Sequence, residues 1–177
     1  MFLWRKIAES IVLPVTYLVN KMLQNSEFPT ILKKGQLTPI FKRGDANKPE
    51  NYRPITNLHN LSKVFERIIL NRIDYFCENQ NILPKSQFGF RKGYSTKDAI
   101  LSLLLQIEKN LLTKTKTCCI FLDLSKAFDM VKHHTLLNIL DSLGFRGDFH
   151  TLLKNYLSNR LFSIKNSDHE YQITRGV

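Results

Sequence analysis

The amino-acid sequence predicts an α+β fold in which helices outweigh short antiparallel strands. Long stretches place apolar residues three and four positions apart, which is the spacing of an amphipathic helix. Shorter apolar runs are bounded by Gly, Pro and Asn, as strands usually are. The 177 residues, 43% of them hydrophobic, can bury the core of one domain, or of one domain and part of another.

Apolar periodicity and capping signals predict five helices. Their expected ranges are about 1–24, Leu61–Cys77, Thr96–Leu112, His134–Leu143 and Phe149–Leu157. Pro14 should mark a kink or a break in the first of them, because proline removes a backbone donor. Ser95 and Asp98 form a variant of the capping box and open the third helix, and Gly144 should stop the fourth.

Short strands are expected between and after these helices. Their predicted ranges are Gln36–Phe41, Thr117–Leu122, Leu161–Lys165 and Tyr171–Thr174. The last two flank the turn NSDH and indicate a hairpin. Thr117–Leu122 is almost continuously apolar, which is typical of a strand buried on both faces. The segment KRGDANKPENYRP should be irregular because it is rich in Gly, Pro and Asn.

The charge of the chain favours a polyanionic partner. Lys and Arg total 26 against 15 Asp and Glu, which gives a net charge of +11. Nucleic acid is the leading candidate, and an anionic membrane surface is the alternative. No apolar run reaches the roughly 18 residues of a membrane span. Cys77, Cys118 and Cys119 should be reduced core residues, which predicts an intracellular location in the cytoplasm or nucleus.

Two glycine-containing loops carry basic side chains, namely Lys42, Arg43, Arg53, Arg91 and Lys92. Glycine lets a backbone approach a phosphate closely, and arginine offers a planar fork of donors. This pattern indicates phosphate binding, although surface cations that only keep a protein soluble are the alternative.

Five strings in order carry a more specific signal: LTPIFKRGD, NYRPITNLHNLSKVFERII, QFGFRKGYST, FLDLSKAFD and LSNR. In this order and at these separations they resemble the reverse transcriptase domain of non-LTR retrotransposons, especially jockey-like elements. The resemblance covers roughly 31–177 and implies a right-hand polymerase that carries out RNA-directed DNA synthesis. It implies fingers at 31–112 and a partial palm at 113–177, preceded by a helical segment at 1–30.

The resemblance also implies a role for the acid that ends the apolar run. By position alone, Asp123 could equally cap the following helix. The family pattern makes it the catalytic, first metal-binding aspartate, with the carbonyl of Leu124 as a further ligand. Two Mg²⁺ or Mn²⁺ ions would stabilise the attacking and leaving oxygens, and such hard ions take oxygen ligands. Asp129 belongs to the same motif but is read as structural.

Other implied roles concern the nucleotide and the nucleic acid. Phe128 matches the residue that excludes a 2′-hydroxyl, and an ordinary core Phe is its alternative. Arg53 and Lys63 match triphosphate contacts, which neutralise a charged leaving group. Arg91 matches a residue near the template and nucleotide, and its alternative is a donor that stabilises its own loop. The expected nucleic-acid contacts are Lys42, Arg43 and Lys92.

The chain departs from the family pattern in one decisive respect. It contains neither the Pro-Gln-Gly-Ser loop nor an adjacent pair of aspartates, and one aspartate cannot hold two ions. We therefore expect a polymerase fragment that is inactive by itself. The expected partners are an RNA template, a DNA primer and deoxynucleoside triphosphates, and no membrane. The alternatives are a non-catalytic protein that binds RNA or an RNA–DNA hybrid, and a partial palm that does not fold stably.

Overall fold

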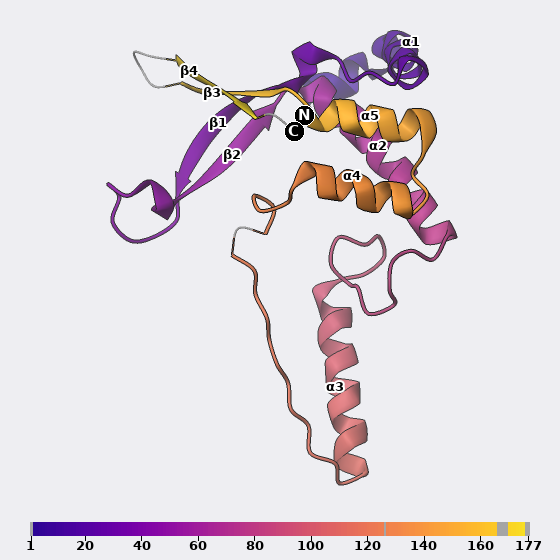
Figure 1. The fold of residues 1–177 in the computed structure, drawn as a ribbon, viewed down its shortest axis with the longest axis vertical. Coiled ribbons are helices and arrows are strands. Elements are labelled where there is room, and N and C mark those ends of the chain that lie inside the picture. The colour runs from indigo at the N-terminus through magenta and orange to yellow at the C-terminus, as the bar shows by residue number, and fades with distance from the viewer. Residues whose placement is uncertain (1, 126, 166–169, 176–177) are drawn as a thin grey trace. The chain divides into compact units, whose positions relative to one another are not determined.

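The computed structural model describes residues 2–125, 127–165 and 170–175, and shows a helix-rich chain with one small sheet (Figure 1). The helices are α1 Phe2–Asn25, α2 Asn60–Asn79, α3 Thr96–Leu112, α4 His133–Ser142 and α5 Gly147–Leu157. The strands are β1 Lys34–Phe41, β2 Tyr52–Leu58, β3 Arg160–Lys165 and β4 Glu170–Arg175. Two short 3₁₀ helices, Thr30–Lys33 and Pro49–Asn51, precede β1 and β2. The α+β class is confirmed.

The four strands form one mixed sheet in the order β2-β1-β3-β4. β1 pairs antiparallel with β2, from Gly35 opposite Leu58 to Phe41 opposite Tyr52. β3 and β4 form the predicted antiparallel hairpin, while its expected turn at 166–169 lies outside the described residues. The expectation of antiparallel strands holds for these two pairs but not for β1 and β3, which pair in parallel. The long chain between them supplies the crossover that a parallel pair needs.

Local signals placed the helices well. α3 has the predicted bounds, and the Asp98 carboxylate accepts hydrogen bonds from the backbone N–H and the hydroxyl of Ser95, at 2.7 and 2.6 Å. These bonds lower the pKa of Asp98 below its usual value. Pro14 lies inside one continuous helix, so α1 is not broken into two pieces.

Two strand predictions were wrong. The last three residues of the segment expected to be irregular, 52–54, belong to β2, because the backbone of Tyr52–Leu58 finds its hydrogen-bond partners on β1 in spite of Pro54 and Asn57. Conversely, residues 117–122 are not a strand. They run as an extended, exposed chain, since within the described residues no strand pairs with them. An apolar run gives a strand only where a neighbour satisfies its backbone groups.

The chain divides into two compact units, which we describe separately. The first unit comprises 1–67 and 131–177. Its core includes Phe28, Phe65 and Leu152, each at most 2% exposed. The ring of Phe28 makes edge contacts with Phe65 and Tyr156, at centroid distances of 6.1 and 5.0 Å. These contacts hold the chain after α1 to α2 and α5.

Buried polar groups add specific links within the first unit. The Ser62 hydroxyl is fully buried and donates to the Leu32 carbonyl oxygen at 2.8 Å. The Lys33 ammonium donates to the Asn155 carbonyl oxygen at 2.6 Å, and burial followed by the charge of Arg160 lowers the pKa of Lys33. The Tyr156 hydroxyl donates to Glu66 at 2.8 Å. These bonds fix the base of β1 against α2 and α5.

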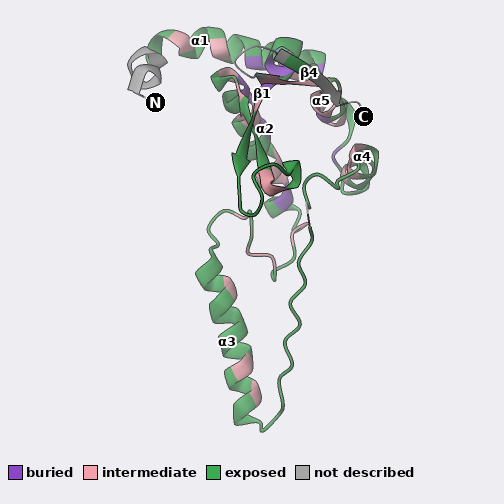
Figure 2. Cartoon of the chain, turned by 90° about the vertical axis from the view of Figure 1, so that its left-hand side faces the viewer, coloured by how far each residue is buried: buried purple, intermediate pink, exposed green. Residues whose placement is uncertain are grey.

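The second unit comprises 68–130 and exposes much apolar surface. Figure 2 shows α3 and the stretch that follows it mostly in the colour of exposed residues. Leu104, Leu112 and Phe121 are 55%, 79% and 83% exposed. Cys118 and Cys119 are also exposed, so the expectation that they are core residues is wrong, whereas Cys77 is buried. None of the helices in the described part of the chain combines the length and the apolar character that crossing a bilayer requires.

Candidate functional site

The paired strands β1 and β2 position the basic residues of the first unit. β2 lies at the edge of the sheet, and Arg53 stands on it opposite Ile40, with its side chain exposed. Lys42 and Arg43 follow β1 directly and are also exposed. Successive side chains of a strand point to opposite faces, whereas directly paired residues share a face. Arg53 therefore shares its face with Ile40, while the pairs on either side of it lie on the other face.

The start of α2 positions the next predicted cation. Lys63 is exposed in the first turn of α2, and Ser62 beside it is the fully buried residue bonded to Leu32. Ser62 thus anchors the turn that presents Lys63. The positive end of the helix dipole at this place favours an anion nearby, which suits a residue predicted to contact phosphate.

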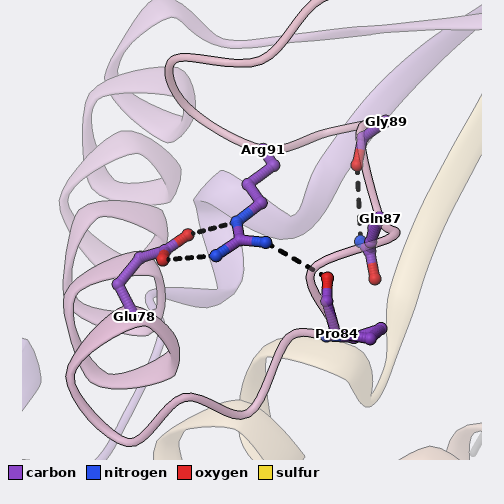
Figure 3. A network of polar contacts seen from close by, with 5 residues as sticks. All are labelled: Glu78, Pro84, Gln87, Gly89 and Arg91. Carbon is purple, nitrogen blue, oxygen red and sulfur yellow. Dashed lines mark hydrogen bonds and ion pairs between the residues drawn. The ribbon is translucent and has the colours of Figure 1, made fainter. Parts of the chain in front are cut away.

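Arg91, in the second unit, is already engaged by the protein (Figure 3). Its guanidinium donates to both carboxylate oxygens of Glu78 at 2.8 Å each, and to the Pro84 carbonyl oxygen at 3.1 Å. It also lies 4.7 Å from the ring centroid of Tyr94. This geometry supports the alternative of a donor that stabilises its own loop. A nucleotide contact would require the guanidinium to leave Glu78, and it stays a prediction.

The ion pair between Arg91 and Glu78 also shifts the pKa of both groups. The hydrogen bond from Arg91, helped by its positive charge, lowers the pKa of the Glu78 carboxyl, and the same bond raises the pKa of Arg91. Both groups therefore stay charged across the neutral range. The loop that carries Arg91 is held to the last turn of α2 by this pair.

The predicted catalytic segment lies in the same unit. Asp123 and Leu124 stand in the extended stretch after α3, and Asp123 is exposed rather than packed into a core. Phe128 is 76% exposed, which does not fit an ordinary core Phe, and its ring makes an edge contact with Phe90 at 5.9 Å between centroids. Lys92 is exposed beside Arg91.

The predicted metal site requires several ligand side chains close together. No group of three or more His, Cys, Asp or Glu that could hold a metal ion occurs in the described part of the chain. The Asp123 carboxylate is the right kind of ligand for a hard divalent ion, but such an ion needs about six oxygen ligands. The described residues thus do not form a metal centre by themselves.

The predicted residues fall into two sets that are described independently. Lys42, Arg43, Arg53 and Lys63 belong to the first unit, and Arg91, Lys92, Asp123, Leu124 and Phe128 to the second. Sequence reasoning missed the polar residues that tie α2 to other segments of the first unit, namely Ser62, Glu66, Tyr156 and Arg160. Their signal was weak, because single polar residues within apolar stretches do not reveal partners far along the chain.

Comparison with known proteins identifies the family. Residues 31–177 match the family model described as reverse transcriptase (RNA-dependent DNA polymerase). In Drosophila melanogaster, the chain is 35% identical over 155 residues to a probable RNA-directed DNA polymerase from transposon BS. It is 37% identical over 156 residues to the corresponding protein from transposon X-element. It is 32% identical over 149 residues to the RNA-directed DNA polymerase from mobile element jockey.

These alignments cover most of this chain but little of the relatives. They include 87%, 87% and 82% of the chain, and 17%, 17% and 16% of the three relatives. The chain thus spans about a sixth of the length of these proteins. With most of its length matched by the family model, it belongs to the reverse transcriptase (RNA-dependent DNA polymerase) family.

Proposed function

We propose that this chain forms the nucleotide-binding part of an RNA-directed DNA polymerase of a non-LTR retrotransposon. The observation that carries the proposal is the family match over 31–177, which includes every predicted site residue. In this proposal 31–112 are the fingers and 113–177 are part of the palm of a right-hand polymerase. The substrates are an RNA template, a DNA primer and deoxynucleoside triphosphates.

Arg53 and Lys63 are proposed to hold the triphosphate. Both are exposed cations on regular elements, one on edge strand β2 and one in the first turn of α2. Cations that are positioned in advance neutralise the charge that develops on the leaving phosphates. Lys42, Arg43 and Lys92 are proposed to contact the nucleic-acid backbone.

Phe128 and Asp123 are proposed to act at the sugar and at the metal. The exposed ring of Phe128 can press against a deoxyribose and reject a 2′-hydroxyl by its bulk. The Asp123 carboxylate and the Leu124 carbonyl are proposed as two oxygen ligands for Mg²⁺ or Mn²⁺. The remaining oxygen ligands are proposed to come from other parts of the polymerase, because such an ion takes about six. Arg91 keeps a proposed place near the template only if Glu78 releases it.

Nucleotide binding tests this function directly. Equilibrium dialysis with dTTP and Mg²⁺ should show binding that Arg53→Ala and Lys63→Ala each weaken by about tenfold, the loss expected for one charged hydrogen bond. Lys21→Ala is the matched control, since Lys21 is an exposed cation on α1 of the same unit. Equal losses in all three variants, or no binding by the unaltered chain, would contradict the proposal.

A second function is favoured by charge. The net charge of +11 fits a protein that binds RNA or an RNA–DNA hybrid without chemistry. The two functions are separated by the dialysis experiment, because a protein that binds only the nucleic-acid backbone has no triphosphate site that depends on Arg53 and Lys63.

A further inference from the structure

The face of the β1–β2 pair that does not carry Arg53 has its own character. Pro39 pairs with Pro54, and Phe41 pairs with Tyr52, so these four side chains share the opposite face. The rings of Phe41 and Tyr52 meet edge to face at 5.4 Å between centroids. This side of the strand pair is therefore a surface of rings, two aromatic and two pyrrolidine.

A groove opens on this face, and we call it the proline groove. It is lined by Pro39, Ala46, Asn47, Pro49, Tyr52 and Pro54, and its volume is about 380 Å³. That volume lies within the range of roughly 300–1,000 Å³ that is usual for small-ligand sites. The lining offers ring faces and few polar groups, so its ligand should be flat and apolar on its own faces.

The loop that closes the groove is held in one conformation by its own hydrogen bonds. The Tyr52 hydroxyl donates to the Ala46 carbonyl oxygen at 2.9 Å, and the Asn51 amide donates to the Asp45 carbonyl oxygen at 2.8 Å. Gly44 has φ +94°, and a Cβ there would lie 2.8 Å from the Asn51 amide nitrogen. A preformed groove loses little entropy when a ligand enters.

Charge selects the class of ligand. Lys42, Arg43 and Lys48 stand exposed on the same loop, beside only two acids, Asp45 and Glu50. Ring surfaces beside cations are the combination by which proteins hold single-stranded nucleic acid, with bases stacked on rings and phosphates on Lys and Arg. A proline-rich peptide would also fit the rings, but it would gain nothing from the three cations.

We propose that the proline groove holds an unpaired base of single-stranded RNA, with the neighbouring phosphates on Lys42, Arg43 and Lys48. A base within a duplex has both faces covered by its neighbours and cannot enter. The inference rests on the RNA partner of the proposed function. It adds a base-binding site on the face opposite the one that carries Arg53.

The test compares two fluorescein-labelled probes by anisotropy in magnesium-free buffer: a ten-nucleotide oligouridine and an abasic ribose-phosphate strand of equal length. Tyr52→Ala removes a ring from the groove, and Ala46→Leu fills the groove while leaving the backbone bonds of the loop available. Each variant should weaken oligouridine binding by about tenfold, the loss of one stacked base, and leave the abasic strand unchanged.

Two further variants serve as controls. Tyr52→Phe keeps the ring but loses the bond to Ala46, and Ile55→Ala removes an apolar side chain, 46% exposed, from the opposite face. Ile55→Ala should bind oligouridine as the unaltered chain does, and Tyr52→Phe should keep most of the binding that Tyr52→Ala loses. The proposal is overturned if Tyr52→Ala and Ala46→Leu weaken binding of both probes equally, or if neither variant weakens oligouridine binding. In the second case, a proline-rich peptide that binds the unaltered chain but neither variant would be the ligand of the groove.

The outcome can be told apart from a failure of the proposed function. The anisotropy assay contains neither dTTP nor Mg²⁺, and its variants avoid Arg53, Lys63 and Asp123. A chain that binds oligouridine through the groove but shows no dTTP binding supports the groove and contradicts the nucleotide site. A chain that binds dTTP through Arg53 and Lys63, but whose oligouridine binding does not depend on the groove residues, supports the nucleotide site and overturns the groove proposal.

Discussion

The guanidinium of Arg91 donates hydrogen bonds to both carboxylate oxygens of Glu78, each 2.8 Å long. This two-point pairing fixes the plane of the guanidinium, which is the geometry that makes arginine–carboxylate pairs specific. Because Glu78 lies in the last turn of α2, the bridge ties the following loop to that helix. The order of the loop therefore depends on the charge of one carboxylate.

We expect Glu78→Gln to loosen this loop. Amide hydrogen exchange over 82–94 should become several-fold faster, whereas Glu108→Gln, at an exposed carboxylate on α3, should change nothing there. Since the folded pKa of Glu78 is lowered, the stabilisation is present above its ordinary value near 4.5 and is lost as pH falls through the folded pKa. The protection of these amides, corrected for the pH dependence of the intrinsic exchange rate, should therefore fall in that acidic range. Equal exchange rates over 82–94 in Glu78→Gln and Glu108→Gln would contradict this role of Glu78.

Tyr156→Phe should destabilise the first unit by about 1–3 kcal/mol, because the part-buried hydrogen bond to the charged Glu66 is lost. Burial raises the pKa of Tyr156 to about 12. A raised pKa gives stability that is present below the ordinary value near 10 and is lost as pH rises through about 12. Urea unfolding from pH 8 to 11 should show an alkaline decline that is smaller in Tyr156→Phe. The exposed Tyr17, changed to Phe, should leave both quantities unaltered.

Ser62→Ala should cost about 1–3 kcal/mol of unfolding free energy, since the buried carbonyl oxygen of Leu32 would lose its donor. Urea denaturation followed by circular dichroism measures this loss. Ser10→Ala, at an exposed position on α1, is the control and should be close to neutral. Equal stability of the two variants would show that the Ser62 bond does not anchor α2.

The affinity of the chain for single-stranded RNA should fall steeply with salt. For single strands, each phosphate contact contributes about −0.7 to the slope of log K against log salt. Replacing both Lys42 and Arg43 by Ala should therefore make the slope less negative by about 1.4. A titration from low to physiological salt measures this. A flat response in the unaltered chain would argue against phosphate contacts altogether.

The isolated 177-residue chain should not extend a DNA primer on an RNA template with Mg²⁺ and deoxynucleotides. The reason is that two metal ions need more oxygen ligands than the one predicted aspartate, Asp123, provides, and the sequence has no adjacent aspartates. Incorporation that Asp123→Ala abolishes would overturn this expectation and show that the chain is a complete polymerase.

Helices were predictable because their signals are local. The bounds of α3 follow from its apolar spacing and from Ser95 and Asp98, all within one segment. The pairing between strands was not predictable, because paired strands lie far apart along the chain. β1 pairs in parallel with β3, and β2 forms from a segment whose composition argued against it. Apolar residues at 117–122 predicted a strand, yet no neighbour among the described residues pairs with it.

The candidate site residues also divide into features that the sequence predicts and features that only the folded chain shows. Motif strings identified Arg53, Lys63 and Asp123 as candidates, and the exposure of all three is compatible with binding roles. The same strings could not reveal that Arg91 is bonded to Glu78 or that Ser62 is buried against Leu32. Such partners depend on how segments meet after folding.

By itself, the sequence determined the family, the helices and the basic character of the chain, because motif order, apolar spacing and charge are written along the chain. Only the tertiary structure decided which strands pair, which cation is already bonded, and that one face of the β1–β2 pair is a groove of rings. The physical reason is that a hydrogen bond or a groove requires atoms from separate segments, and their meeting is set by the packing of the whole unit.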